Sequence, residues 1–214
     1  NSVDPQIFYD TRMPDPNAPI GKRFNVITHG SVIPRYGHDT LIRAVGIILE
    51  HAPETRLTIL GEGQSRTELE QLTKNLGLEH VVTFCGFLPL DEMMRRLLDA
   101  DVGAVTMVRN VETDLIHTIK MYEYMMTGIP VVISRTKAIE AYFNETDVQF
   151  CEASNPDSVA DALLLLRNEP YRRLQLAQNA RQRCNSYGTK DQKQFYLQEI
   201  LGVKPSTRQS RVPT

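Results

Sequence analysis

Residues 120–133 read KMYEYMMTGIPVVI, and this stretch indicates a helix, a tight turn and a short buried strand. Lys, Met and Glu favour the helix, and Gly128 suits the left-handed position just past its end. Pro130 prevents the helix from continuing, and the apolar run from Val131 is typical of a core strand. Helix, turn and buried strand together predict one unit of a layered α/β fold.

Lys120 and Glu123 are three residues apart on this helix and therefore share a face. A cation and a carboxylate near a helix start could meet a phosphate and a sugar hydroxyl. The alternative is a surface ion pair that contributes about 0–1 kcal/mol to stability. Spacing alone leaves both interpretations open.

Short apolar strands alternate with amphipathic helices along the rest of the chain. This alternation is typical of a parallel sheet covered on both faces, and it predicts a single doubly wound α/β domain. Strands are expected at residues 24–27, 57–59, 81–84, 102–105, 131–133 and 147–151. Helices are expected at residues 41–48, 65–76, 90–98, 120–127, 156–166, from 170 onward, and 190–201.

Local signals mark the expected helix starts and the ends of the domain. Ser65 and Glu68 have the spacing of a capping box, and Asn155 precedes a proline at a first helical position. Residues 1–22 contain four prolines and predict an extended lead-in or linker. The domain is expected at 23–202, followed by a polar, disordered tail at 203–214.

The composition limits the possible functions. The chain has 214 residues and is 41% apolar, and its net charge of −2 argues against a nucleic-acid-binding protein. Its three cysteines lack metal-ligand spacing and, without a signal peptide, fit a reducing compartment. No apolar run approaches a membrane span, and the start without Met indicates a fragment or processed piece.

Loops after the strands are the expected ligand site of such a sheet. The loop 29–37 contains Gly30, which allows close backbone approach, the hydroxyl of Ser31, and Arg35, which could pair with phosphate oxygens. The following helix would add backbone N–H groups. The alternative is a plain turn with a solvated arginine.

Two other loops carry weaker signals. Gly61-Glu62-Gly63 begins like a dinucleotide fingerprint, but Arg66 stands at the third glycine, so a tight turn is expected. In loop 107–116, Asp114 could accept hydrogen bonds from a hydroxylated ligand or cap a helix. His117 could act as a general acid or base, or simply be exposed. The sequence contains no motif of a catalytic nucleophile with histidine and no metal-binding motif. A catalytic pair of carboxylates is not excluded, because Asp and Glu are plentiful.

Several motifs in the same order resemble the C-terminal, donor-binding domain of retaining glycosyltransferases of the family-four type. That domain is one Rossmann-like half of the GT-B fold, and the resemblance covers about residues 1–200. The matching stretches are Asn1-Ser2-Val3-Asp4 with Phe8, His29-Gly30 through Gly37, Leu60-Gly61-Glu62-Gly63, Gly86-Phe87-Leu88-Pro89, and Tyr122-Glu123-Tyr124-Met125 with Gly128-Ile129-Pro130-Val131-Val132.

The resemblance implies a role for individual residues. Glu123 would bind the ribose hydroxyls, and the backbone around Ile119 and Lys120 would bind the diphosphate. Phe87 and Leu88 would lie beside the base. The first glutamate of the family pattern falls at Leu115, so Leu115 is counted among the expected donor-binding residues. Its neighbour Asp114 is therefore the candidate catalytic carboxylate.

This sequence departs from the family pattern at charged positions. Ser31 stands where the family has an arginine, and Tyr36 stands where it has a lysine. In a subgroup with a lysine matching Lys120, a proline precedes the motif, and here that residue is Thr118. Lys120 and Arg35 are therefore expected to supply the phosphate-binding charges.

The resemblance implies transfer of a hexose-type sugar from a UDP- or GDP-sugar to a glycan or lipid-linked acceptor, with retention and without a metal or cofactor. The partner would be an N-terminal acceptor-binding half, which this chain lacks, so the isolated chain is expected to bind the donor but not transfer it. The helix at 190–201 would cross back to that half. A cytoplasmic location is expected, and the full-length enzyme could associate peripherally with the inner face of the membrane.

Two alternatives stay open on the sequence. One is half of a nucleotide-sugar epimerase, which shares the fold but uses carboxylates and histidine from both halves. The other is a non-catalytic effector-binding α/β module of the receiver type. A receiver would need an acidic residue after the first strand, where this chain has His29-Gly30-Ser31.

Overall fold

A computed structural model describes residues 11–186, which form a sheet of six parallel strands in the order β3-β2-β1-β4-β5-β6. The strands are β1 Phe24–His29, β2 Thr55–Leu60, β3 Val82–Gly86, β4 Val102–Val105, β5 Val131–Ser134 and β6 Gln149–Cys151. The helices are α1 His38–Ile48, α2 Arg66–Asn75, α3 Leu90–Leu98, α4 Ile119–Thr127, α5 Lys137–Glu140, α6 Pro156–Asn168 and α7 Pro170–Ser186, with 3-10 turns η1 Pro34–Tyr36 and η2 Thr113–Leu115.

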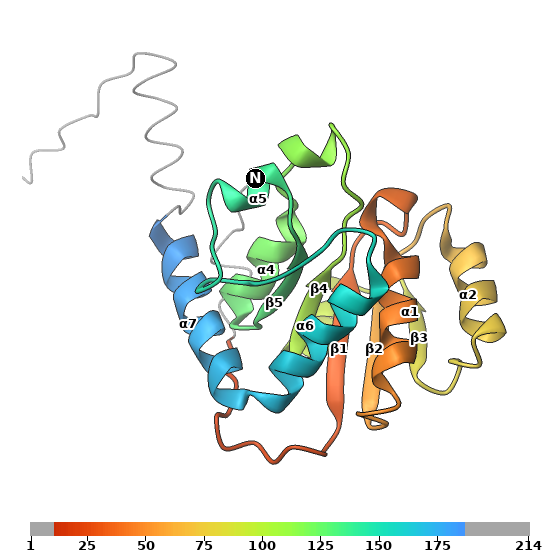
Figure 1. The fold of residues 1–214 in the computed structure, drawn as a ribbon, viewed down its shortest axis with the longest axis horizontal. Coiled ribbons are helices and arrows are strands. Elements are labelled where there is room, and N and C mark those ends of the chain that lie inside the picture. Colours follow the sequence, from red (N-terminus) through yellow and green to blue (C-terminus); the bar gives the residue numbers. More distant parts are fainter. Residues whose placement is uncertain (1–10, 187–214) are drawn as a thin grey trace, which may run out of the picture.

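Helices cover both faces of the sheet, as Figure 1 shows. Helices α1, α2 and α6 pack on one face, and α3, α4 and α7 pack on the other, each set over its own buried apolar cluster. The doubly wound α/β prediction is therefore confirmed. Strand β1 lies between β2 and β4, where the order of the strands reverses. A crevice at the carboxyl end of β1 is the expected ligand site of such a sheet.

Most of the expected elements between residues 24 and 186 are present. The sixth strand is shorter than expected and begins only at Gln149. Asn155 caps α6 as predicted, because its side-chain oxygen accepts a hydrogen bond from the Ser158 backbone N–H at 3.1 Å. The sequence did not indicate η1, η2 or α5. The helix expected at 190–201 and the tail at 203–214 lie outside the described residues, as do residues 1–10.

The capping box predicted for α2 is wrong. Ser65 occupies the N-cap position, but its backbone is helical, with φ −85° and ψ −5°, and its side chain makes no capping hydrogen bond. An N-cap residue normally has an extended backbone, which aims its oxygen at the first-turn N–H groups. The Ser65 hydroxyl and the Glu68 carboxylate are therefore not used in a cap.

Helix α4 is anchored by a buried tyrosine. The Tyr124 ring lies over Gly103 of β4, where a Cβ atom would be 2.5 Å from the ring. The Tyr124 hydroxyl accepts a hydrogen bond from the His29 backbone N–H at 3.1 Å. Gly128 then ends the helix with φ +81°, as the sequence predicted. This packing fixes the first turn of α4 beside the carboxyl end of β1.

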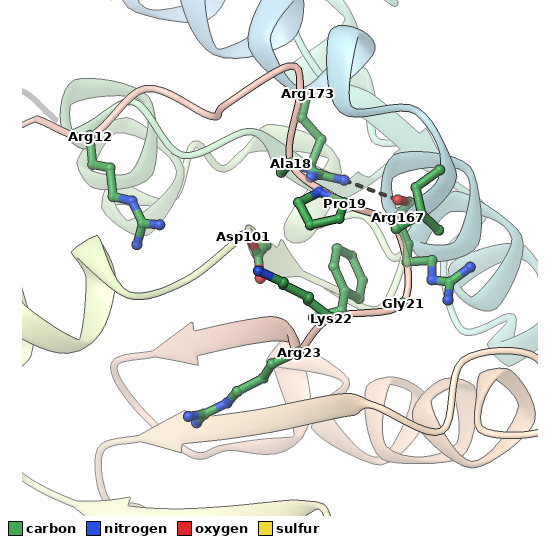
Figure 2. Close-up of a pocket in the computed structure, with 11 residues that line it drawn as sticks. Arg12, Ala18, Pro19, Gly21, Lys22, Arg23, Asp101, Arg167 and Arg173 are labelled. Carbon is green, nitrogen blue, oxygen red and sulfur yellow. Dashed lines mark hydrogen bonds between the residues drawn. The ribbon is translucent and has the colours of Figure 1, made fainter.

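Residues 11–23 run along the opposite, amino edge of the sheet (Figure 1). Arg12 donates from its backbone N–H to the Thr127 carbonyl at 3.1 Å, which ties this segment to the end of α4. Figure 2 shows a pocket of about 180 Å³ at this edge, lined by several basic side chains around Asp101. Arg173 lies there with its guanidinium donating to the Leu166 and Arg167 carbonyl oxygens.

Two of the charged groups at the amino edge are engaged within the fold. Arg167 forms an ion pair with Glu54 at 2.5 Å, and Asp101 accepts a hydrogen bond from the Asn25 backbone N–H at 2.8 Å. Ligands of doubly wound sheets bind at the carboxyl ends of the strands. The functional site is therefore expected at the other edge.

Candidate functional site

A pocket of about 440 Å³ opens at the carboxyl end of β1, between the loop after that strand and the first turn of α4. Strand β1 ends beside α4 because of the Tyr124 anchor, so two segments far apart in the sequence meet here. The pocket is lined by His29, Gly30, Ser31, Tyr36, Ile116, His117, Thr118, Ile119, Lys120 and Glu123.

Lys120 is almost completely buried, with 4% of its surface exposed. Its ammonium nitrogen lies 3.3 Å from the centroid of the Tyr36 ring, a cation–π contact. Its stem passes Gly30, where a Cβ atom would lie 3.1 Å from the Lys120 Cε atom. Burial lowers the pKa of Lys120 to about 7, against the opposing effect of Glu123. The surface ion pair considered from the sequence is therefore wrong.

Glu123 lines the same pocket, and 14% of its side chain is exposed. Burial raises the pKa of this carboxyl to about 7, and the charge of Lys120 opposes that rise. Its Oε2 atom lies 3.2 Å from Nε2 of His29. Burial, helped by Lys120, lowers the pKa of His29 to about 3, so His29 is neutral. The contact is therefore not an ion pair at neutral pH.

The His29–Glu123 approach also lacks hydrogen-bond geometry. Nε2 of His29 has no hydrogen-bond partner among residues 11–186, although the atom is buried. The hydroxyl of Thr118, just before α4, is buried and unpartnered within the same part of the chain. Buried polar atoms normally have partners, so these orphaned atoms fit a pocket that is completed by a polar ligand.

His117 lies at the rim of this pocket with both ring nitrogens engaged. Nε2 lies 2.7 Å from the Ala138 carbonyl oxygen, which can only accept, so Nε2 donates. Nδ1 lies 2.7 Å from the Tyr122 hydroxyl and accepts from it in the neutral ring. Burial lowers the pKa of His117. This arrangement favours a structural role, linking α4 to α5, over acid–base chemistry.

The loop after β1 is supported by the glycines that follow β2. A Cβ atom on Gly61 would lie 1.9 Å from the Gly30 carbonyl oxygen, and one on Gly63 would lie 2.2 Å from the Val32 carbonyl oxygen. The Gly30 backbone N–H donates to the Leu60 carbonyl at 2.9 Å. The tight turn expected at residues 61–63 lies instead at residues 64–65, where the Arg66 backbone N–H donates to the Gly63 carbonyl at 3.1 Å. Residues 61–63 pack closely against the pocket loop.

Five of the nine predicted donor-binding residues come together in the pocket. They are Gly30, Ser31, Ile119, Lys120 and Glu123. Arg35 points elsewhere, since its Nη2 atom pairs with Glu112 at 2.8 Å. Its part in phosphate binding stays a prediction.

The remaining candidates lie outside the pocket lining. Phe87 is 83% exposed and Leu115 is also largely exposed, whereas Leu88 packs against the apolar cluster under α4. Asp114 accepts hydrogen bonds from the Arg109 side chain at 3.2 Å and from the Lys137 backbone N–H at 3.1 Å. It thus joins η2 to the start of α5, and its catalytic role stays a prediction.

Sequence reasoning did not assign a role to four pocket residues, namely His29, Tyr36, Ile116 and Thr118. His29 looked like the last residue of a strand, and Tyr36 looked only like the replacement of a lysine. The signal in the sequence was position, since His29 ends β1, and Ile116 and Thr118 come just before α4. Tyr36 lies further along the loop that follows β1. Their burial could not be derived from that position.

A metal centre is not indicated. Within residues 11–186, His, Cys, Asp and Glu side chains form no group of three or more that could hold a metal ion. The same part of the chain contains no helix long and apolar enough to cross a membrane.

The fold is that of the C-terminal half of a GT-B glycosyltransferase. The C-terminal domain of LpcC, a glycosyl transferase group 1 family protein from Francisella tularensis, matches with a TM-score of 0.71 and 21% identity over 87% of this chain and 99% of that one. HepE from Anabaena, solved with UDP and glucose, matches with a TM-score of 0.74 and 19% identity over 85% of this chain and 49% of that one.

Residues 11–183 match the family of glycosyl transferases group 1, and the chain belongs to this family. The expected resemblance to a C-terminal GT-B domain is confirmed.

Curated relatives include a GDP-mannose-dependent alpha-(1-6)-phosphatidylinositol monomannoside mannosyltransferase of Mycolicibacterium smegmatis, 28% identical over 79% of this chain and 47% of that protein. A D-inositol 3-phosphate glycosyltransferase of Corynebacterium urealyticum is 28% identical over 71% of this chain and 36% of that protein. The chain spans less than half the length of these relatives.

Proposed function

We propose that this chain is the nucleotide-sugar-binding half of a retaining glycosyltransferase. The intact enzyme would transfer a hexose-type sugar from a GDP- or UDP-sugar to a glycan or lipid-linked acceptor. One observation carries the proposal: Lys120 and Glu123 of α4 and the loop at Gly30 line a single pocket at the switch point of the sheet. Family membership supports sugar transfer over the epimerase and the non-catalytic module.

Each side of the pocket suits one part of the donor. The Glu123 carboxylate can accept hydrogen bonds from the vicinal hydroxyls of a ribose, each contributing about 1.5–3 kcal/mol. Lys120 and the unbonded backbone N–H groups of the first turn of α4 suit a diphosphate. Because Lys120 is buried, its attraction to a phosphate is screened less than at the surface.

The proposed transfer step is the retaining reaction that the family resemblance implies. The bond between the anomeric carbon and the diphosphate oxygen breaks, and the acceptor hydroxyl oxygen bonds to the same carbon on the same face. The hydroxyl proton leaves with the diphosphate. Lys120 and the α4 N–H groups would neutralise the charge that develops on the leaving group, so the proposal needs no metal or cofactor.

The relatives suggest which donors to test first. GDP-mannose appears in the names of four curated mannosyltransferases, and UDP is bound in the HepE structure. The acceptor would be bound largely by an N-terminal half, and the intact enzyme would work in the cytoplasm, at the inner membrane face for a lipid-linked acceptor. We therefore expect this chain to bind donor without catalysing transfer.

Calorimetric titration with GDP, UDP, GDP-mannose and UDP-glucose tests the proposal. We expect the chain to bind at least one of them, and Glu123→Gln to weaken binding roughly tenfold to a hundredfold through lost charged hydrogen bonds. Glu79→Gln is the matched control, because Glu79 is exposed at the amino edge before β3. Equal binding by wild type and Glu123→Gln would overturn the ribose assignment, and no binding to any of the four would overturn the proposal.

A further inference from the structure

A second pocket, of about 400 Å³, lies between the first turns of α1 and α2. Both helices directly follow strands, so this pocket opens at the carboxyl edge of the sheet, as the first does. It is lined by Ile33, Pro34, His38, Asp39, Ser65, Glu68, Leu69, Leu72 and Val108, none of which lines the first pocket.

His38 is the feature that sets this pocket apart. Only 2% of its surface is exposed, and neither ring nitrogen has a hydrogen-bond partner among the described residues. Burial, helped by the charge of Lys120, lowers the pKa of His38 to about 3, so the ring is neutral, with one donor and one acceptor nitrogen. A buried histidine in an ordinary core has partners for its ring nitrogens.

Three further polar side chains line the pocket without partners. Asp39, Ser65 and Glu68 make no side-chain hydrogen bond or ion pair within residues 11–186. Asp39 and Glu68 stand in the first turns of α1 and α2, where a carboxylate interacts favourably with the helix dipole. The two acids are also exposed to solvent and need no protein partner. The buried nitrogens of His38 are therefore the feature that a ligand would explain.

The lining specifies the chemistry of the occupant. The polar groups are mainly hydrogen-bond acceptors, and no cation lines the pocket, so an anion such as a phosphate would be repelled. Apolar side chains such as Ile33, Leu69 and Leu72 cover the remaining wall. A pyranose ring presents both hydroxyl donors and an apolar C–H face, which suits such a mixed surface.

One loop separates the two pockets. Tyr36 lines the first pocket and His38 lines the second, and their rings lie 6.3 Å apart in an edge-to-face arrangement. Between them Gly37 adopts φ +51°, and a Cβ atom there would lie 2.1 Å from the Thr106 carbonyl oxygen. The loop is thus held tightly against β4, which gives the two pockets a fixed relation.

We propose that the pocket at His38 is a carbohydrate subsite that binds a neutral sugar unit of the acceptor glycan. The assignment to the acceptor rests on the proposed transfer function, because a sugar bound there would lie across one loop from the donor. The binding itself rests on the buried, unpartnered ring of His38, the three polar side chains beside it and the apolar wall.

Two-dimensional NMR of the ¹⁵N-labelled chain, titrated with methyl α-D-mannopyranoside and methyl α-D-glucopyranoside, tests the subsite. We expect saturable shifts in the signals of residues 33–39 and 65–72. Glu68→Gln removes an exposed carboxylate without creating a cavity, and should weaken binding about fivefold or more, as for one lost hydrogen bond. His38→Phe should weaken it similarly, and Glu79→Gln should not.

Shifts that do not saturate, or that are equal in Glu68→Gln and wild type, would overturn the subsite. So would shifts of the same signals by calcium chloride but not by the glycosides, because they would show that the carboxylates bind a cation. A parallel titration with GDP and UDP separates this result from the donor site. Nucleotide binding without glycoside binding would overturn only the proposed sugar subsite. Glycoside binding without nucleotide binding would overturn only the proposed donor site.

Discussion

The Nε2 atom of His29 lies 3.2 Å from the Oε2 atom of Glu123 at the carboxyl end of β1. Burial lowers the pKa of His29 to about 3 and raises that of Glu123 to about 7. Both shifts have the same cause, since a buried site disfavours a charge of either sign. The pocket therefore contains polar groups that are poorly solvated until a ligand reaches them, at some cost in stability.

The first prediction concerns this cost. Glu123 binds more protons in the folded than in the unfolded state between about pH 4.5 and 7, so its contribution to the free energy of unfolding falls as the pH rises through that range. Glu123→Gln should therefore stabilise the chain by about 1–3 kcal/mol at about pH 8 and have little effect near pH 4. Urea denaturation at both pH values measures the difference. Glu79→Gln should show no such dependence, and a destabilised Glu123→Gln at pH 8 would contradict the burial argument.

The second prediction concerns protons exchanged on donor binding. With a pKa of about 7, Lys120 is mostly neutral near pH 8, and a bound diphosphate should recharge it, so binding should take up protons there. Near pH 6 Lys120 is already charged, whereas Glu123 must ionise to accept ribose hydroxyls, so binding should release protons. Calorimetry of GDP binding in buffers of different ionisation enthalpy shows whether protons are taken up or released at each pH.

Two variants test whether the proton uptake comes from Lys120 and the proton release from Glu123. Lys120→Met should abolish the uptake near pH 8, and Glu123→Gln should abolish the release near pH 6. Lys74→Met provides the control, because Lys74 is exposed at the far end of α2. An exchange of the same sign at both pH values would be incompatible with this assignment.

The third prediction concerns the partner of Lys120. The Tyr36 ring lies 3.3 Å from the Lys120 ammonium and stands where the family pattern has a lysine. Tyr36→Leu should weaken GDP or UDP binding by about threefold to thirtyfold, because a buried cation–π contact contributes on the order of 0.5–2 kcal/mol. Tyr36→Phe keeps the ring and should bind nearly as wild type does. If both variants bind equally weakly, the hydroxyl rather than the ring is what the donor needs.

The fourth prediction compares two glycines with positive φ. Gly61 has φ +121° and no room for a Cβ atom beside the Gly30 carbonyl, whereas Gly77 has φ +67° and nothing within 4 Å. Gly77→Ala should cost about 1 kcal/mol from backbone strain alone. Gly61→Ala should cost more, because the pocket loop must also move, and it should reduce nucleotide affinity. Denaturation and calorimetry of both variants measure this, and equal losses of stability would show that the contact with Gly30 is unimportant.

Much of the fold followed from local patterns. The short apolar strands and the amphipathic α1 predicted the parallel sheet, because strands buried on both faces need side chains that are apolar in both directions. Asn155 with its following proline, and Gly128, marked helix ends through backbone chemistry that needs no tertiary context. The capping box at Ser65 failed, because the conformation of an N-cap residue depends on the path of the preceding loop.

The candidate site could be predicted only in part. Lys120, Glu123 and the Gly30 loop were expected together because the carboxyl ends of neighbouring parallel strands meet at one edge. His29 and His38 were missed, since neither a strand end nor a first helical turn reveals how deeply a side chain is buried. Arg35 was assigned by its proximity in the chain, but its contact with Glu112 comes from another loop.

By itself the sequence determined the order of strands and helices along the chain, the edge of the sheet at which a ligand site is expected, and the residues of α4 that face that edge. These properties depend on hydrophobic period and on the preferences of Gly, Pro and Asn, which act over a few residues. Only the tertiary structure decided that Lys120 lies buried under Tyr36 and that His29 approaches Glu123. It also decided that the ring nitrogens of His38 have no hydrogen-bond partner within residues 11–186. Protonation and hydrogen bonding in these groups depend on burial by distant segments, which local sequence does not encode.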